Sequence, residues 1–389
     1  MRILFVNARI ILPDDILKGS LLVENDKIKE INPAKNTEAD VTIDCKNKFL
    51  SPGFIDIHLH GGGGHDFMEG TKEAYEKISK VHLAHGTTSF IPTSVAANKT
   101  KIISFLKACE EAMTKNYTKV RILGAHLEGP YFNPVRRGAH DLKELRHPDK
   151  AEYEEIVKAT KVLKRWTIAC ELPNALELGK YLHANGINAS IGHSDACEEE
   201  VIRAVNNNYT STTHHYNAMS MLKKVGAYRI PGVVEAGQLL DCLYTEIIAD
   251  GHHIPLNIIA LNYKIKTANK MVLVTDAMMA ASCEDGAYYI GGKEAGLKAI
   301  KKGDIALVED LSGFAGSVAT TNHLIRIAKK VGIPLVEAVK MLTLTPATLI
   351  NADKELGSIE KGKKADLIIF DDNIDIFQSF IDGKEVYRK

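Results

Sequence analysis

The chain has 389 residues, of which 45% are hydrophobic and 25% are charged, and this balance is typical of a soluble globular protein. Its 49 Lys and Arg residues equal its 49 Asp and Glu residues, so the formal net charge is zero. The composition therefore favours neither a nucleic-acid nor a membrane partner, and a small anionic ligand would need only a local basic pocket.

The six cysteines are scattered along the chain and form no CxxC pair. This spacing predicts reduced thiols and a cytoplasmic protein. The apolar run at residues 1–7 is shorter than the hydrophobic core of a signal peptide and far shorter than a membrane span. We therefore expect neither a secretion signal nor a membrane anchor.

Both ends of the chain contain short runs with the alternation typical of β-strands. The runs lie at residues 3–7, 20–24, 28–31, 41–43, 365–370, 377–381 and 384–387. Because two β-rich ends flank a different middle, we expect one small β-sandwich domain assembled from residues 1–52 and 356–389.

Residues 53–355 alternate between β-like runs and helix-like stretches. The eight β-like runs lie at residues 53–60, 87–93, 120–128, 166–171, 187–193, 209–214, 243–250 and 271–276. Helix-like stretches between them include residues 73–85, 99–114, 149–163 and 198–206. Eight strands that alternate with helices predict an α/β fold, a parallel (β/α)8 TIM-like barrel, rather than a doubly wound sheet.

Metal-competent side chains recur where these runs end, which is where the catalytic groups of such barrels gather. His58 and His60 end the first run, and residues two apart on a strand share a face, so both can point into the barrel mouth. Imidazoles suit a divalent transition metal, and the glycines at 61–64 let the backbone pass close to a ligand. Taken alone, the pair leaves a metal site and a structural role equally open.

Later runs supply further candidates. The third run ends at Glu128, the fifth at His193, the sixth at His214 and the eighth at Asp276. Each of these has an ordinary structural explanation when taken singly, such as a carboxylate that caps a helix. Their recurrence at the ends of several strands predicts one shared metal site. His126 shares a face with Glu128 but lies deeper in the strand, so we expect it to support the site or to pack against it.

The chemistry of these groups points to hydrolysis. A divalent metal lowers the pKa of a water molecule and polarises a carbonyl group, and an unreactive amide needs both effects. The reaction also needs a base that later returns its proton to the departing amine. Asp276 is the candidate for this role. The residues alone therefore predict a metal-dependent hydrolase.

Eight short segments carry a resemblance to a known family. They are residues 52–61 (PGFIDIHLHG), 126–130 (HLEGP), 192–194 (GHS), 213–219 (THHYNAM), 249–253 (ADGHH), 274–277 (VTDA), 315–317 (AGS) and 344–347 (LTPA). Together they resemble the amidohydrolase superfamily and, within it, the N-acetylglucosamine-6-phosphate deacetylases. The likeness runs along the whole chain, and HLEGP with THHYNAM is its most specific part.

The resemblance implies hydrolysis of N-acetyl-D-glucosamine 6-phosphate to D-glucosamine 6-phosphate and acetate, as part of amino-sugar metabolism. It implies that Glu128, His193 and His214 hold the principal divalent metal, which is zinc or iron. Asp276 is then the general base and acid.

The pair His58 and His60 bears on the number of metals. Some members of the family have other residues at these two positions and work with one metal. Because both histidines are present here, we expect a second metal position with Glu128 as the bridge between the two.

The resemblance also implies a set of residues that contact the sugar phosphate. The set comprises Ala139, His140, Asn217, Ala218, Arg229, Asp250, His253, Phe314, Ala315, Gly316 and Ser317. An arginine and a histidine suit a phosphate dianion. In the family the arginine reaches the phosphate from the partner subunit, which implies a homodimer. Residues 227–230 around Arg229 are less polar than the usual Gly-Arg-Glu stretch, so this match is the weakest of the set.

Two alternatives remain open. One is another amidohydrolase that acts on cyclic amides or on N-acyl amino acids, although those enzymes commonly use a carboxylated lysine where this chain has Glu128. The other is a non-catalytic barrel that serves as a subunit or a binding module. Loss of metal ligands is the usual sign of that fate, and the expected ligands are all present.

Overall fold

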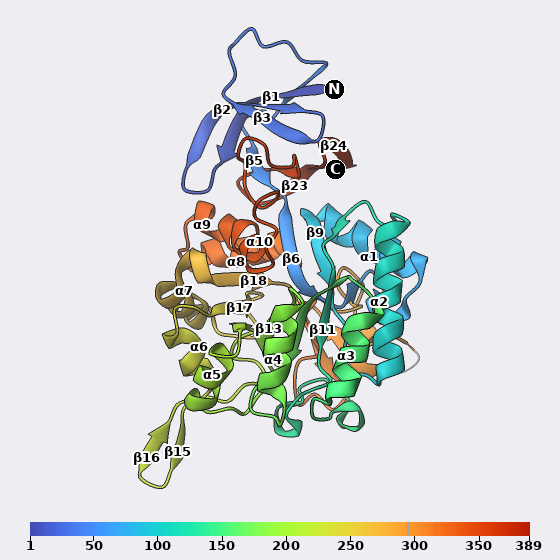
Figure 1. The fold of residues 1–389 in the computed structure, drawn as a ribbon. Helices are drawn as coiled ribbons and strands as arrows, with labels where there is room; N and C mark the ends of the chain where they lie inside the picture. Colours follow the sequence, from blue (N-terminus) through green and yellow to red (C-terminus); the bar gives the residue numbers. More distant parts are fainter. Residues whose placement is uncertain (294–295) are drawn as a thin grey trace.

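The computed structural model describes residues 1–293 and 296–389, which form a small β region and a larger α/β region (Figure 1). Both chain ends lie in the small region. The chain passes once from the β region into the α/β region and returns at its end. No helix in the described residues is long and apolar enough to cross a membrane.

The small region is one mixed sheet with the strand order β24-β23-β22-β5-β1-β2-β3, and β4 pairs with β1. Its strands are β1 (Arg2–Ile11), β2 (Ile16–Glu24), β3 (Lys27–Ile31), β4 (Val41–Asp44), β5 (Phe49–Pro52), β22 (Leu367–Phe370), β23 (Ile376–Ile381) and β24 (Lys384–Arg388). The two chain ends join where Pro52 on β5 lies opposite Leu367 on the antiparallel β22. The rings of Phe5 and Phe380 pack edge to face at 5.1 Å, although two strands separate β1 from β23. The sheet therefore folds back over a shared apolar core.

The α/β region is built on parallel strands in two sheets, β10-β9-β6 and β11-β12-β13-β14-β17-β18. The strands are β6 (Phe54–Leu59), β9 (Thr87–Pro92), β10 (Arg121–Ile122), β11 (Ala125–Glu128), β12 (Leu163–Ile168), β13 (Asn188–Ile191), β14 (Tyr209–Thr212), β17 (Tyr244–Ile248) and β18 (Met271–Val274). Isolated parallel bridges join the two sheets at both seams, Thr93 to His126 and Leu59 to Ala277. The strands therefore form one curled parallel sheet. Each of the eight runs expected in residues 53–355 overlaps it, but the run at 120–128 holds both β10 and β11, and the run at 166–171 covers only the second half of β12.

A helix separates each strand of the curled sheet from the next, with β10 and β11 together as one step. The helices are α1 (Lys72–Ala84), α2 (Lys99–Thr114), α3 (Lys150–Ala159), α4 (Ala175–Ala184), α5 (Glu198–Val205), α6 (Val233–Leu239), α7 (Leu256–Lys270), α8 (Thr321–Lys330), α9 (Leu335–Lys340) and α10 (Leu344–Leu349). Polar side chains begin several of them: Thr71 caps α1 and Asn98 caps α2 by accepting a backbone N–H of the first turn. Gly86 then turns the chain into β9 at a φ of 95°, where a Cβ would lie 2.9 Å from the ring of Phe54.

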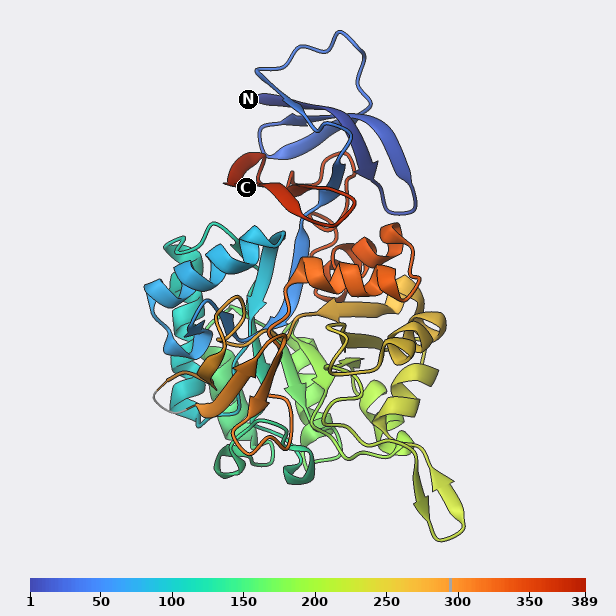
Figure 2. The ribbon, with the colours of Figure 1, turned by 180° about the vertical axis from the view of Figure 1, so that it is seen from behind.

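Two insertions interrupt this alternation. A hairpin of β15 (Lys223–Val225) and β16 (Tyr228–Ile230) follows β14 and projects away from the body of the molecule (Figure 1). A three-stranded antiparallel sheet of β19 (Gly286–Ile290), β20 (Leu297–Lys302) and β21 (Ile305–Val308) follows β18 and is seen in orange from behind (Figure 2). A short pair, β7 (Gly61–Gly62) and β8 (His65–Asp66), follows β6, and the 3-10 turns are η1 (Phe67–Glu69), η2 (Pro134–Arg136) and η3 (Leu142–Glu144).

The β region is tied to the curled sheet by charge as well as by packing. Arg121 on β10 donates to Asp366 through two hydrogen bonds of 3.0 and 3.1 Å and pairs with Asp382 at 2.9 Å. Burial opposes the charge of Arg121, but the two carboxylates raise its pKa above the ordinary value. The contact therefore joins residues that are about 245 positions apart in the chain.

Candidate active site

The site lies at the carboxyl ends of the parallel strands. His58 is on β6 and His60 directly follows it, and the rings of both are almost fully buried. Their side chains point to the same side of the strand, with ring centroids 5.4 Å apart. The backbone N–H of His60 donates to the carbonyl of Ala277, beyond β18, at 2.8 Å. Pairing across the seam of the sheet therefore sets the position of the histidine pair.

Glu128, the last residue of β11, stands at the centre of the site. Its Oε1 atom lies 3.1 Å from His193 Nε2 and 3.0 Å from His214 Nε2. The same oxygen is 3.6 Å from His58 Nε2, whereas Oε2 lies 3.2 Å from His60 Nε2. The carboxylate is thus shared between two pairs of histidines that come from different strands.

Asp276 closes the cluster on the side of β6. It follows β18, and its Oδ1 atom lies 3.1 Å from His60 Nε2 and 3.5 Å from His58 Nε2. The side chain is about 9% exposed, and it lines the same cavity as His60, His193 and His214. Asp276 can therefore reach both a metal and a ligand that lies over the metal.

Three of these residues have left-handed backbone conformations, which side chains other than glycine rarely adopt. The φ angles are 51° for His193, 33° for His214 and 49° for Asp276. Such conformations cost free energy and persist where the surrounding structure holds them, which is common at functional sites. The chain therefore turns sharply at the end of each strand and aims the side chain toward Glu128.

The charges of the cluster balance one another. Burial opposes a charge on His58, but Glu128 and Asp276 raise its pKa well above the ordinary value of 6.5. The same carboxylates raise the pKa of His60 to about 9 against the effect of burial. Burial alone would raise the pKa of both carboxylates, but the histidines lower it. A metal cation bound by the histidines can replace the histidine protons and so balance the charge of the two carboxylates.

The donor atoms fit a divalent metal. His58 Nε2 and Asp276 Oδ1 are buried and have no hydrogen-bond partner among the described residues. Ligand atoms held about 2.1 Å from a tetrahedral ion would lie roughly 3.4 Å from one another. The Nε2 atoms of the four histidines lie 3.0 to 3.6 Å from the carboxylate oxygens of Glu128. The cluster can therefore hold a divalent metal through its histidines and carboxylates.

The hydrogen bonds of His193 and His140 distinguish a candidate metal ligand from a hydrogen-bond donor. His193 Nδ1 lies 2.8 Å from the carbonyl oxygen of Arg136, so this nitrogen donates and leaves the Nε2 lone pair toward Glu128. His140 has the opposite arrangement, because its Nδ1 accepts the backbone N–H of Ala96 at 3.1 Å. Burial lowers the pKa of His140 to about 3, so its Nε2 carries the proton of a neutral ring. His140 therefore offers a hydrogen-bond donor to the cavity rather than a metal ligand.

A cavity of about 330 Å³ opens over the cluster. Its lining includes His60, Glu128, His193, His214 and Asp276. The remaining lining residues are Val135, Arg136, Gly138, Ala139, His140, Asn217, Ala218, Ile248, His253, Ile290, Val308, Ser312, Gly313, Phe314 and Gly316. Loops after several strands and the β19–β21 sheet therefore enclose a space large enough for a small molecule.

Most residues of the expected substrate set lie at this cavity, but four do not line it. Asp250 lies behind His253, whose Nδ1 atom is 2.7 Å from its carboxylate. Ala315 and Ser317 are fully buried behind the wall, and Ser317 Oγ donates to a backbone carbonyl. Arg229 lies on the projecting hairpin, and in this single chain it is not part of the cavity lining.

Sequence reasoning did not identify Arg165, Glu246 and the walls that Ile290 and Val308 provide. Arg165 on β12 and Glu246 on β17 are both fully buried beneath the cluster. The signal available in the sequence was the charge of Glu246, which lies two residues before Ile248 within the run Tyr244–Ile248. Ile290 and Val308 lie on an insertion whose position over the cavity no strand pattern indicates.

Comparison with known proteins identifies the family. Residues 49–387 match the model of the amidohydrolase family. The chain belongs to the amidohydrolase family. This family is metal-dependent, in agreement with the group of histidines and carboxylates around Glu128.

Relatives and solved structures narrow the placement within the family. The chain is 34% identical to an N-acetylglucosamine-6-phosphate deacetylase of Haemophilus influenzae over 99% of both chains. It is 30% identical to an N-acetylgalactosamine-6-phosphate deacetylase of Escherichia coli O157:H7 over 90% of both chains. A crystal structure of an N-acetylglucosamine-6-phosphate deacetylase from Pasteurella multocida superposes over the full length of both chains, with a TM-score of 0.92 at 30% identity. The resemblance expected from the short motifs is confirmed.

Proposed function

We propose that the protein hydrolyses the acetamide of N-acetyl-D-glucosamine 6-phosphate, with D-glucosamine 6-phosphate and acetate as products of amino-sugar metabolism. The observation that carries the proposal is the convergence of four histidines, Glu128 and Asp276 at one cavity in a chain related to deacetylases along its whole length. An intact set of ligand-type residues argues against a non-catalytic scaffold.

Each residue of the cluster has a chemical role in this proposal. A bound divalent ion supplies Lewis acidity, which makes an amide carbonyl more electrophilic and a water more acidic. Asp276 takes the proton of the attacking water and returns it to the departing amine nitrogen, so that one water is consumed and one C–N bond breaks. Burial would raise the pKa of Asp276, but the neighbouring positive charge lowers it. A bound cation would supply that charge in place of the histidine protons, so the carboxylate stays ionised and can act as a base.

The arrangement around Glu128 supports two metal positions. His193 and His214 approach Oε1, and these three residues would hold the principal ion, zinc or iron. His60 approaches Oε2, and with His58 it would hold a second ion that Glu128 bridges. Imidazole and carboxylate ligands suit several divalent metals.

The cavity lining supports a sugar phosphate as the substrate. His140 presents its Nε2–H beside Glu128, where it can donate to the acetamide or to a hydroxyl group. Asn217 and Ala218 line the same wall, and the Phe314 ring lies 4.4 Å from that of His253. His253 is oriented by Asp250 and is suited to a phosphate.

We further infer a homodimer in which Arg229 reaches the phosphate of the other subunit. The inference is supported by the hairpin that carries Arg229, because it projects from the body of the molecule (Figure 1). Two of its large apolar side chains are exposed. Tyr228 is 76% exposed and Val225 is 53% exposed. Apolar side chains on a projecting element are typical of an interaction surface.

We also propose a detailed fold, a barrel with a β-sandwich, and a cytoplasmic location. Eight strand–helix steps and two seam bridges support a (β/α)8 barrel over residues 53–355. The packing of Phe5 on Phe380 supports a β-sandwich formed by residues 1–52 and 356–389. None of the six cysteines forms a disulfide, which supports a cytoplasmic protein.

Acetate release tests the proposal directly. Metal-loaded protein is assayed with N-acetyl-D-glucosamine 6-phosphate, its galactosamine epimer and both unphosphorylated sugars. We expect release from a phosphorylated sugar with kcat/KM at least about 100-fold above that of its unphosphorylated form, since charged hydrogen bonds contribute roughly 1.5–3 kcal/mol each. Preference for the galactosamine epimer would favour the function named for the Escherichia coli relative. Equal turnover with and without the phosphate would show that the substrate is another acetylated amine.

A further inference from the structure

We propose that Glu246 and Arg165 are positioning residues that hold His58 in the form needed to bind the second metal. The inference rests on the metal site of the proposed function and adds residues outside the ligand set. Neither side chain reaches the cavity, and both are fully buried beneath the cluster. Their effect must therefore pass through His58 and its neighbours.

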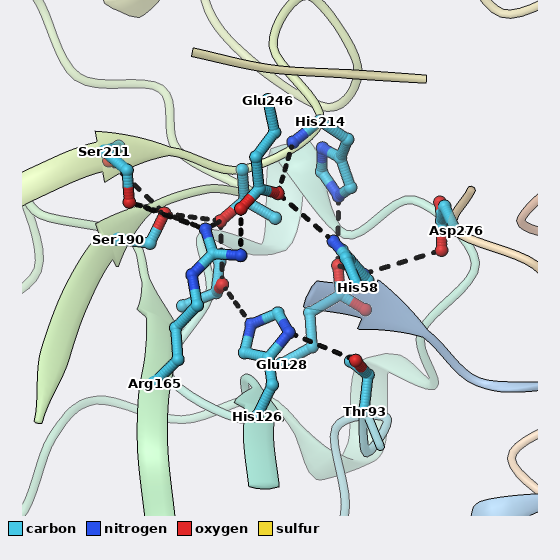
Figure 3. A network of polar contacts seen from close by, with 12 residues as sticks. His58, Thr93, His126, Glu128, Arg165, Ser190, Ser211, His214, Glu246 and Asp276 are labelled. Atoms are coloured by element: carbon cyan, nitrogen blue, oxygen red, sulfur yellow. Dashed lines mark hydrogen bonds and ion pairs between the residues drawn. The ribbon is translucent and has the colours of Figure 1, made fainter. Parts of the chain in front are cut away.

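Glu246 contacts both halves of the metal cluster (Figure 3). Its Oε2 atom lies 3.3 Å from His58 Nδ1, on the side of the ring away from Glu128. The same oxygen accepts the backbone N–H of His214 at 3.4 Å. One carboxylate on β17 therefore bonds to a ligand on β6 and to the turn that carries a ligand after β14.

Arg165 allows Glu246 to remain charged in this buried position. Arg165 Nη1 forms an ion pair with Glu246 Oε1, and both side chains have no exposed surface. Nη2 donates to Ser190 Oγ at 2.7 Å and to Thr213 Oγ1 at 3.2 Å. Because an arginine is always protonated and both partners are fully buried, the Arg165 guanidinium balances an ionised Glu246 carboxylate beneath the site.

An ionised carboxylate can only accept hydrogen bonds, so His58 Nδ1 must carry the donated proton. The lone pair of a neutral ring is then on Nε2, which lies 3.6 Å from Glu128 Oε1 and 3.5 Å from Asp276 Oδ1. Nε2 has no hydrogen-bond partner among the described residues. Glu246 therefore selects the tautomer of His58 whose free nitrogen points toward the other second-site ligands.

His126 holds the ring of His58 from one further side. The two rings meet edge to face, with centroids 4.8 Å apart. His126 lies 2.7 Å from Thr167 Oγ1 through Nε2 and 3.2 Å from Thr93 Oγ1 through Nδ1. Both ring nitrogens of His126 thus face threonine hydroxyl groups, which hold this ring in place. His58 is fixed by a carboxylate at Nδ1 and by the His126 ring beside it.

Graded removal of metal from the loaded holoenzyme tests the inference. Wild-type protein, Glu246→Gln and the double variant Arg165→Met/Glu246→Gln are dialysed against a series of zinc–chelator buffers, and the zinc retained per chain is counted. We expect one equivalent to leave both variants at a free zinc concentration about 10–100-fold higher than in the wild type. The other equivalent is retained as in the wild type.

Two matched variants control for loss of stability. Glu246→Gln leaves Arg165 unpaired in a buried position and can fail to fold, whereas the double variant removes both charges and leaves Ser190 and Thr213 bonded to each other at 2.7 Å. Arg121→Met/Asp366→Asn breaks a pair of the same type between the two regions of the protein. We expect this control to retain both metal equivalents as the wild type does.

Three results would overturn the inference. Unchanged retention of both equivalents would show that the buried pair only fills the interior. If retention of both zinc equivalents is weakened equally, and the Arg121→Met/Asp366→Asn control loses zinc in the same way, the effect is one of general stability. Wild-type protein that releases acetate with one metal per chain would remove the second position and leave the proposed function intact. Two metals without acetate release would contradict the function and leave the positioning role standing.

Discussion

At the scale of single residues, the hydrogen bonds at Nδ1 of His58, His140 and His193 decide what each of these rings can do. His193 and His58 both donate through Nδ1, to a carbonyl and to a carboxylate respectively, and this leaves Nε2 free for a metal. His140 accepts at Nδ1 and therefore presents an N–H to the cavity. Residue type alone would not separate these roles, because all three are buried histidines within reach of Glu128.

Asp276→Asn tests the proton-transfer role. The amide keeps the size of the carboxylate but cannot take a proton from water, and general acid–base catalysis typically contributes about 100- to 10,000-fold. We expect kcat to fall at least about 100-fold while the principal metal is retained through Glu128, His193 and His214. Acetate release and metal content measured on one preparation check this. Near-normal turnover would remove Asp276 from the mechanism.

His253→Ala tests recognition of the phosphate. His253 lines the cavity and its ring is held by Asp250 and by Phe314. Loss of one charged hydrogen bond, worth roughly 1.5–3 kcal/mol, should lower kcat/KM for the sugar phosphate about 10- to 100-fold. We expect little change for the unphosphorylated sugar. His252→Ala is the control, because its side chain is exposed. An equal loss on both sugars would assign His253 to the sugar ring instead.

At the scale of elements, five strands of the curled sheet, β6, β11, β13, β14 and β18, carry the residues of the cluster within two positions of their carboxyl ends. The parallel arrangement brings these carboxyl ends together, and left-handed turns at His193, His214 and Asp276 point the side chains inward. The helices between the strands supply stability and have no residue in the metal cluster. A change in a helix should therefore act on folding more than on chemistry.

Lys266→Met on α7 tests whether a change in a helix affects folding more than catalysis. Lys266 Nζ donates to the carbonyls of Gly237 and Leu240 at the end of α6, and burial lowers its pKa from 10.5 to about 8. Between these two pH values the unfolded chain holds the proton and the folded chain does not, so stability rises with pH, by at most about 3 kcal/mol. Below about pH 8 the folded protein is less stable, by the same amount, than it would be if Lys266 kept its ordinary pKa.

Urea unfolding at pH 7.5, 9 and 10 measures this effect. The unfolding free energy of the wild type relative to Lys266→Met should increase across this range. Lys264→Met on the same helix removes an exposed lysine and should change the difference little. A difference that does not depend on pH would show that Lys266 stays charged in the folded protein. We expect acetate release at pH 7.5 to be similar in all three proteins.

At the scale of the whole molecule, the projecting hairpin of β15 and β16 contributes no residue to the cavity lining of the single chain. Replacing the exposed Tyr228 by Asp should shift the protein from dimer to monomer in sedimentation and raise KM for the sugar phosphate about tenfold or more. Arg229→Met should raise KM similarly but leave the dimer intact. A dimer in which Arg229→Met has normal KM would exclude this arginine from the phosphate site.

The sequence by itself determined the strand–helix order and the candidate ligands. Apolar runs bounded by helical stretches are local features, and each of the eight runs overlaps a strand, although β12 begins three residues before its run. The HxH pair and the strand-end Glu, His and Asp residues were visible because chemistry-bearing side chains interrupt apolar runs.

Only the tertiary structure decided how these residues work together. The contact of Glu246 with His58 joins positions 188 residues apart, and the pair of Arg165 with Glu246 joins β12 to β17 across the interior of the curled sheet. Tautomer, charge and cavity shape depend on such distant neighbours rather than on local pattern. His140 and His193 show the same limit, since each obtains its role from a backbone group that only folding brings near.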